Sequence, residues 1–227
     1  RGAALSLIFV IIEGAIGAGI VLFELVANNA SVARTISIAA HLINTLILLM
    51  WLTLTAWWAS GKPAFRLRGQ GRLGTMLVKG FLYMLLISAS GAITALGDTL
   101  FPAESLAEGI QQDLSPTAHF LIRLRIWHPA IAVFTGLYLI WASTIVAQQR
   151  PSADTIFYSR GLRLMFVLQL GVGALNVFLL APVWMQMVHL LMADAVWMIQ
   201  VLLMAAAHAT PEGEQMETAG LSPAAAD

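Results

Sequence analysis

Six long apolar stretches, separated by shorter polar ones, dominate the pattern of this chain. They lie near residues 4–26, 35–58, 76–96, 118–147, 162–181 and 184–206. Each is about 20 residues long or slightly longer, which is enough for a helix to cross the hydrocarbon core of a bilayer. The pattern therefore predicts an all-α fold: a polytopic membrane bundle of six transmembrane helices.

Composition agrees with this prediction and excludes several kinds of chemistry. Hydrophobic residues make up 59% of the chain and charged residues 11%, whereas a soluble domain has about 25% charged residues. The formal net charge is zero, which gives no indication of a nucleic-acid partner. There is no cysteine, so disulfides, thiolate-held zinc, iron–sulfur clusters and cysteine nucleophiles are excluded within this chain.

The loops between the apolar stretches differ in charge. Segments 59–75 and 148–163 carry seven basic residues: Lys62, Arg66, Arg68, Arg72, Arg150, Arg160 and Arg163. Segment 97–117 has no Lys or Arg but contains four acidic residues. By the positive-inside rule, both termini and the two basic loops are predicted to be cytoplasmic. Residues 208–227 are polar and rich in Gly, Pro and Ala, which predicts a disordered cytoplasmic tail.

Three histidines lie inside predicted spans at similar depth. Counting along the helices puts His41, His128 and His189 within roughly the outer half of the bilayer, which indicates one or two sites in a single layer. An iron porphyrin takes an imidazole on each face and fits between the helices of a bundle. Arg123 and Arg125 lie on the outer side of His128, where they could bind its propionates.

Structural roles are open for the same residues. An intramembrane histidine can simply bond to a neighbouring helix, and the two arginines can extend to the membrane surface without binding a ligand. Methionine could also supply a heme ligand, but it is common filler in apolar cores. Glu24 and Asp194 are compatible with a proton path or with bonds between helices.

An internal repeat links the first and last pairs of predicted helices. "IIEGAIGAGIVL" at 11–22 aligns with "VLQLGVGALNVF" at 167–178, which matches Gly17 with Gly173 and Glu13 with Gln169. A histidine follows in the next helix of each pair, His41 or His189. The repeat predicts two four-helix halves and eight helices, with the first two expected to precede residue 1. Glu13 is expected in the cytoplasmic half of its helix, without a catalytic role.

Several longer motifs resemble a known family. "GAITALGDTLFPA" followed by "RLRIWHPAIAV" is the most specific combination, accompanied by "EGAIGAGIVL", "HLINTLILLMWLTLTAWW" and "APVWMQMVHLLMADAVW". Together they resemble the heme A synthase family, which acts in cytochrome oxidase assembly, over about residues 11 to 200. The resemblance implies two pseudo-symmetric four-helix halves. Residues 1–58 would be the second part of the substrate half, 59–75 a cytoplasmic loop and 76–207 the heme b half.

The resemblance also implies roles for the predicted site residues. His128 and His189 would ligate the iron of a heme b, with Arg123 and Arg125 beside the cofactor. His41 would be the catalytic, iron-binding residue that faces the substrate heme O. A first histidine of that pair, with a nearby Glu, would belong to a helix before residue 1.

The implied reaction is stepwise oxidation of a heme O methyl group to a formyl group, with oxygen taken from water. The implied setting is the bacterial inner (plasma) membrane, with the lipid bilayer and a heme O synthase that delivers heme O as partners, and a homo-oligomer is allowed. An alternative is a bis-histidine membrane cytochrome b that only transfers electrons. A heme-free transporter ranks third: it predicts charged or broken helices at mid-membrane, whereas the spans here are mostly continuous and the polar residues gather near the outer face.

Overall fold

The structure is a computed structural model and describes residues 2–64, 66 and 69–209. Within these residues, every regular element longer than one residue is a helix. They are α1 (Gly2–Leu22), α2 (Val32–Ala59), α3 (Gly71–Leu100), α4 (Leu106–Leu114), α5 (Phe120–Arg125), α6 (Trp127–Gln149), α7 (Ala153–Phe178) and α8 (Val183–His208). Six helical segments are long and apolar enough to span a membrane, with α5 and α6 forming one of them. The predicted all-α fold with six spans is confirmed. The predicted disordered tail lies, from residue 210, outside the described residues.

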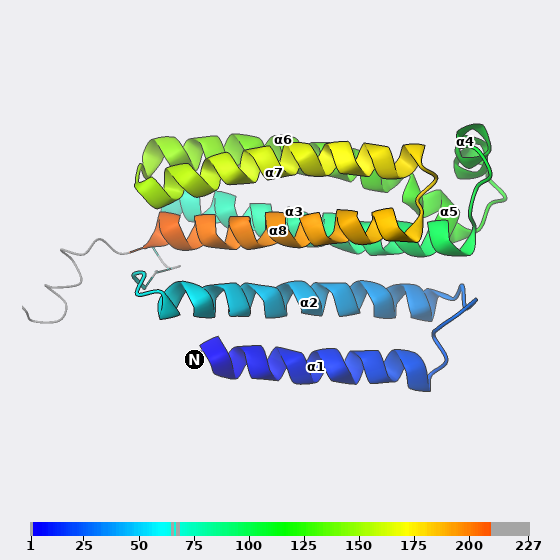
Figure 1. The fold of residues 1–227 in the computed structure, drawn as a ribbon, viewed down its shortest axis with the longest axis horizontal. Coiled ribbons are helices and arrows are strands. Elements are labelled where there is room, and N and C mark those ends of the chain that lie inside the picture. The colour runs from blue at the N-terminus through cyan, green and yellow to red at the C-terminus, as the bar shows by residue number, and fades with distance from the viewer. Residues whose placement is uncertain (1, 65, 67–68, 210–227) are drawn as a thin grey trace, which may run out of the picture.

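The long helices run side by side, and four of them form a closed ring. Helices α3, α6, α7 and α8 contact one another in that order around the ring, α2 packs on α3 and α8, and α1 packs on α2 (Figure 1). The start of α1 and the loops after α2 and α6 lie at one end, which we call the inner end. Helices α4 and α5 lie at the opposite, outer end.

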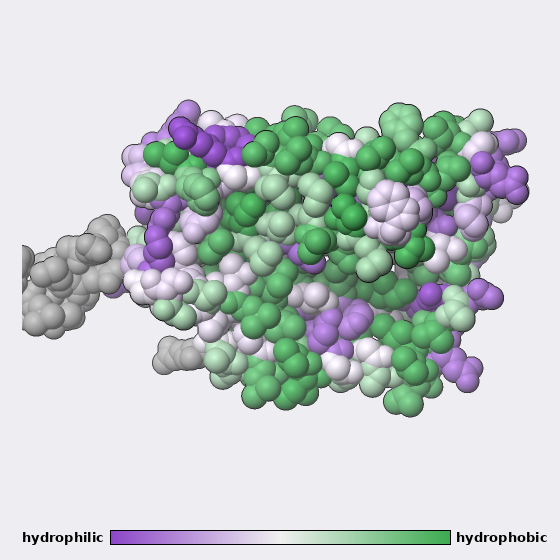
Figure 2. All heavy atoms as spheres, in the orientation of Figure 1, coloured by the Kyte–Doolittle hydropathy of each residue, from purple (hydrophilic) through white to green (hydrophobic). Residues whose placement is uncertain are grey.

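The surface has the polarity of a membrane protein. Figure 2 shows a broad hydrophobic band across the middle of the molecule, with hydrophilic residues gathered at both ends. Large apolar side chains such as Leu22, Leu137 and Leu191 are exposed on this surface, where lipid tails would cover them. The protein is therefore a multi-pass membrane protein.

The core lies between α2 and the ring of four helices. Its largest buried side chains include Trp197 and Phe166, and α1 contributes only Gly2 and Ser6 to the buried set. The indole N–H of Trp197 donates to the carbonyl of Leu46 at 2.7 Å and so connects α8 to α2. Such bonds matter here because apolar contact alone gives little driving force for helix association within lipid.

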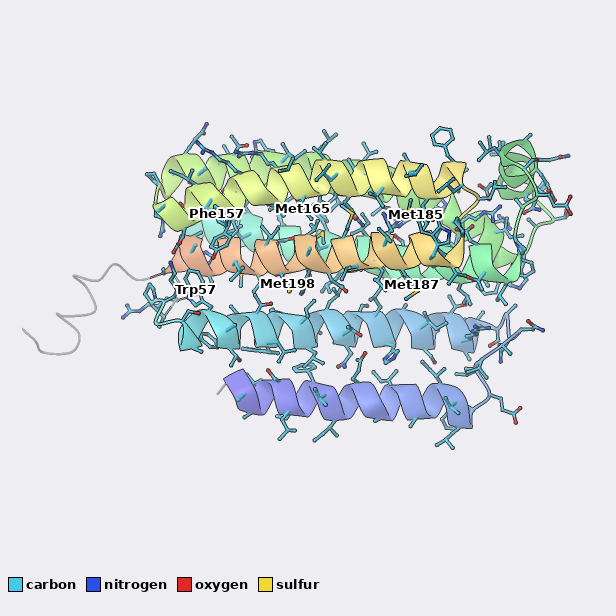
Figure 3. All side chains as sticks on the ribbon, viewed as in Figure 1. Trp57, Phe157, Met165, Met185, Met187 and Met198 are labelled. Atoms are coloured by element: carbon cyan, nitrogen blue, oxygen red, sulfur yellow. The ribbon has the colours of Figure 1, made fainter. Side chains whose placement is uncertain are left out.

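Helix α8 faces two sides of the molecule. Met185 is buried on the side toward α7, whereas Met187 and Met198 lie on the side toward α2 (Figure 3). Helix α8 thus packs against α7 on one side and α2 on the other.

Three predicted boundaries were wrong. Helix α7 begins at Ala153 rather than near 162, because Ser152 and Thr155 form a capping box and the polar first turns were counted as loop. The outer segment contains α4, which was not predicted, and its first turn is capped by Ser105. The fourth span is divided at Ile126 into α5 and α6.

The ends of α1 and α7 have the same backbone geometry, at positions that the internal repeat aligns. Both helices finish in a left-handed residue, Glu24 with φ 54° and Leu180 with φ 61°. In both, the next amide, of Leu25 or Ala181, donates to the carbonyl five residues earlier at 2.8 Å. Glu24 and Leu180 are separated by the same 156 residues as Gly17 and Gly173, so the two hairpins share one backbone design.

Candidate functional site

Two of the three predicted histidines lie beside each other in the four-helix ring. The ring centres of His128 (α6) and His189 (α8) are 6.4 Å apart, and their planes meet at 81°. An imidazole nitrogen binds a transition metal at about 2 Å, and the nitrogen lies about 1 Å from the ring centre. Two imidazoles on opposite sides of one metal ion therefore have centres about 6 Å apart, which is the spacing of this pair.

Hydrogen bonds leave one nitrogen of His128 available. Its Nδ1 lies 3.0 Å from Oγ of Ser90, and that hydroxyl donates to the carbonyl of Ile87 at 2.8 Å. Because the hydroxyl donates to Ile87, Oγ is the acceptor of a hydrogen bond from the Nδ1–H of His128, an assignment made from the bonding pattern. The lone pair then resides on Nε2, and a partner of this kind is what orients a metal-binding histidine. Sequence reasoning missed Ser90.

His189 has a polar atom that lacks a partner. Its Nδ1 is buried and has no hydrogen-bond partner among the described residues. Its Nε2 lies 3.3 Å from the side-chain nitrogen of Gln169, which also donates to the backbone carbonyl of His189 at 2.9 Å. A buried ring nitrogen without a partner costs about 1–3 kcal/mol, so Nδ1 is the nitrogen of His189 at which a bound group would supply a missing interaction.

Glycines set how closely the histidine rings approach the neighbouring helix. A Cβ atom placed on Gly91 or Gly173 would lie only 3.0 Å from Cε1 of His128 or His189, respectively. At Gly17 the same construction gives 3.8 Å to Cε1 of His41, which is an ordinary contact. Each of the three histidines therefore packs on a glycine of another helix. The sequence repeat aligned Gly17 with Gly173 but did not predict these contacts, and Gly91 was not part of it.

Among the described residues, His41 has no hydrogen bond, ion pair or ring contact with His128 or His189; it lies on the side of α2 that faces α1. Its Nδ1 is 3.0 Å from a carboxylate oxygen of Glu13, although the angle is not that of a hydrogen bond. Glu13 also accepts hydrogen bonds from the side chains of Asn44 and Thr45. Glu13 was expected in the cytoplasmic half of its helix, but it lies near the middle of α1, beside His41.

The two predicted arginines differ in their surroundings. Arg125 is 8% exposed, and its guanidinium donates to Asp98 (3.1 Å) and Asp113, to the carbonyl of Gly109 and to the side chain of Gln112. It therefore fastens α4 to the outer end of α3 rather than pointing freely at a ligand. Arg123 is exposed, and its side chain has no hydrogen bond or ion pair within the part of the chain that the structure describes.

The pair of histidines suits a metal ion that is already coordinated by a cofactor better than it suits a bare ion. The described residues contain no group of three or more His, Asp or Glu side chains placed to hold a metal ion. A porphyrin iron needs only two axial ligands from the protein. The pair His128 and His189 fits that need, and it does not fit a bare ion that takes four protein ligands.

Comparison with known proteins agrees with the sequence motifs. The family model described as "Cytochrome oxidase assembly protein", COX15-CtaA, matches residues 1–201. The chain belongs to this family. The resemblance to the heme A synthase family is thereby confirmed.

Two curated relatives were also found, and they are longer proteins. Both are named "Protoheme IX farnesyltransferase" and come from two strains of Thermus thermophilus; they are 50% and 49% identical over 202 residues. The match covers 89% of this chain but 33% of each relative, so the chain spans about a third of their length. No solved structure matches.

Proposed function

We propose that this chain is a heme A synthase, which oxidises a methyl group of heme O to a formyl group and holds a bis-histidine heme b among α3, α6, α7 and α8. The observation that carries the proposal is the pairing of His128 and His189 at 6.4 Å in a cytochrome oxidase assembly protein. In this reading residues 76–207 form the heme b half and residues 1–58 contribute to the substrate half, joined by the loop 59–75.

The residues around the pair would bind and orient the cofactor. His128 and His189 would hold it, and the Ser90 hydroxyl would keep the His128 ring in the tautomer that leaves Nε2 free. Arg123 is the arginine we assign to a propionate, because Arg125 already donates to four protein acceptors. A heme b bound here would supply one-electron transfer.

His41 would face the substrate. Glu13 beside its Nδ1 would favour a proton on that nitrogen and a lone pair on Nε2, which is the arrangement that makes an imidazole a stronger metal ligand. His41 and Glu13 would thus bind and position heme O, while apolar side chains of α1 and α2 exclude water. We assign His41 the catalytic role because it would contact the substrate.

The relatives suggest where the substrate comes from. Their name describes farnesyl transfer to protoheme IX, and a farnesylated heme is the substrate proposed here. We therefore assign the chain a heme O synthase as a partner that delivers heme O within the same membrane. In the bacterial inner membrane, the basic inner end would face the cytoplasm, since positive loops are retained there.

Heme content tests the cofactor site. Purified protein should show the Soret band of a six-coordinate heme, and His128→Ala and His189→Ala should each lose most of the bound heme b, measured as pyridine hemochromogen per protein. His41→Ala is the matched control and should retain it. If both His128→Ala and His189→Ala kept full heme, the assignment of the pair would be wrong.

Pigment analysis tests the reaction. Cells that make heme O and express the chain within its whole natural protein should accumulate heme A, identified by chromatography of extracted hemes. His41→Ala should abolish heme A formation and retain heme b. An electron-carrying cytochrome b would instead show the heme b spectrum and produce no heme A.

A further inference from the structure

An open groove lies on the outside of the ring, between α3 and α6 near the inner end. Its volume is about 630 Å³, and its main lining side chains are Arg72, Thr75, Lys79, Tyr83, Tyr138 and Trp141. None of the residues that line it is acidic. The groove is far along the helices from His128, which begins α6 at the opposite end, so the heme sites proposed above do not use it.

Two cations of this groove have no partner. Arg72 and Lys79 are exposed, and neither side chain makes a hydrogen bond or ion pair with any residue that the structure describes. They are seven residues apart and so lie on the same face of α3. Lys79 is about 12 Å along the helix from Gly71 at 1.5 Å per residue. A cation at such a position in a membrane span needs an anion or a route to the interface.

Aromatic side chains from both helices form the rest of the groove lining, with Tyr83 on α3 and Tyr138 and Trp141 on α6. Tyr83 and Tyr138 pack edge to face with ring centres 4.8 Å apart, and Trp141 lies 5.6 Å from Tyr138. The hydroxyl of Tyr138 donates to the carbonyl of Met76 at 2.8 Å, which fixes its ring across the two helices. The groove therefore combines cations near the interface with a rigid apolar wall.

The second cavity at the inner end provides a contrast. It has a volume of about 500 Å³ and is lined by Arg150 and Asp154 among others. There, Arg150 donates to Gln70 and to the carbonyl of Ala207, and Asp154 is paired with Lys62 at 2.6 Å. Its charged groups already have partners within the protein, so charge gives no reason for an anionic ligand there.

We propose that the groove between α3 and α6 is a binding site for an anionic phospholipid. The phosphate would lie between Arg72 and Lys79, which donate to its oxygens, and the first part of an acyl chain would lie along Tyr83 and Trp141. Anionic headgroups are attracted to basic residues at the cytoplasmic surface by about 1 kcal/mol per cation, or about fivefold in binding. A zwitterionic phospholipid would lack this advantage.

Tryptophan quenching measures occupancy of the groove directly. The whole protein is placed in vesicles of dioleoyl phosphatidylcholine that contain either brominated phosphatidylglycerol or brominated phosphatidylcholine at equal mole fraction. The signal of Trp141, which is 54% exposed, is the difference between the protein and its Trp141→Phe variant. Brominated phosphatidylglycerol should quench this signal with a relative association constant at least about fivefold higher.

Charge variants give the specificity control. Arg72→Gln/Lys79→Gln should reduce the preference to about one, whereas Lys79→Arg should retain it. Arg160→Gln, which removes an exposed cation from α7 toward the same end, should leave the preference unchanged, and circular dichroism verifies folding of each variant. Equal quenching by both lipids in the unmodified protein, or the same loss of preference in Arg160→Gln, would overturn the proposal.

Discussion

The hairpins α1–α2 and α7–α8 share one backbone design but differ in the residue that faces the histidine. Both end their first helix with the same left-handed cap, and both place a glycine beside the histidine of the second helix. In the first hairpin the neighbour of that histidine is the carboxylate of Glu13; in the second it is the amide of Gln169.

The difference shows how one scaffold can prepare two imidazoles for different tasks. Asn44 and Thr45 hold Glu13 from α2, whereas the corresponding residues of α8, Met192 and Ala193, carry no such donors. The first hairpin thus presents a histidine beside a negative charge. The second presents a histidine beside a neutral amide, with a second histidine across the ring.

Loss of Arg125, which fastens α4 to the outer end of α3, should give the largest change in stability. This contact belongs to neither of the two hairpins. Arg125→Leu leaves Asp98 and Asp113 without their cation in a partly buried place, which should lower the free energy of unfolding by about 3 kcal/mol. Hydrogen exchange should quicken in α4. Arg123→Leu is the matched control and should leave exchange in α4 unchanged; equal effects of the two variants would contradict the assignment of Arg125 as the fastener.

Substitution of the glycines beside the histidines should have the next largest effect and should differ between the two hairpins. Gly173→Ala and Gly91→Ala bring a methyl group to 3.0 Å from a histidine ring, which must then move, and heme b affinity should fall by about tenfold to a hundredfold. Gly17→Ala meets His41 at an ordinary 3.8 Å and should leave heme b binding unchanged. Titration of heme into protein depleted of heme measures all three, and a loss in Gly17→Ala as large as in Gly173→Ala would remove the distinction.

Exchanging the two polar neighbours should have a smaller effect. Gln169→Glu places a negative charge beside His189, which stabilises the oxidised iron, so the reduction potential of heme b should fall. Glu13→Gln removes the charge beside His41 and should weaken heme O binding about tenfold while the potential of heme b stays the same. Potentiometric titration measures the reduction potential of heme b in both variants. A shift of this potential in Glu13→Gln would contradict the assignment of Glu13 to the substrate side.

The ion pair that links the two hairpins at the inner end should contribute least to stability. Lys62, in the loop after α2, lies 2.6 Å from Asp154 at the start of α7, and this hydrogen bond raises the pKa of Lys62. The pair is well exposed, so Asp154→Asn should cost about 0.5 kcal/mol or less. Because the pKa of Lys62 is raised in the folded protein, the stabilisation is present at neutral pH and lost as pH rises through that pKa. Thermal unfolding at pH 7 and above pH 11 measures this.

The hydrophobic pattern was sufficient to predict the spans, because span length follows from bilayer thickness. Depth along the helices placed the three histidines in one layer, and the family resemblance supplied the pairing of His128 with His189. The partners of Arg125 could not be predicted, because they depend on how the outer segment folds into α4. The start of α7 could have been predicted, since Ser152 and Thr155 are a recognisable cap.

The place of Glu13 required more than depth along a helix. Counting residues separated it from His41, but a glutamate side chain reaches across the gap between two packed helices, and Asn44 and Thr45 direct it there. Ser90 was missed for a related reason, because a serine in an apolar span gives no periodic signal. Side-chain contacts between helices were therefore the part of the site that the sequence left open.

The crossing of the two imidazole planes at 81° has a magnetic consequence. Each axial imidazole overlaps through its π orbital with one of two iron d orbitals, and rings at nearly right angles overlap with different ones. The two d orbitals then stay almost equal in energy, so a ferric iron held between His128 and His189 in this orientation would be strongly anisotropic in a magnetic field. Frozen-solution electron paramagnetic resonance would therefore report the angle between the two imidazole planes.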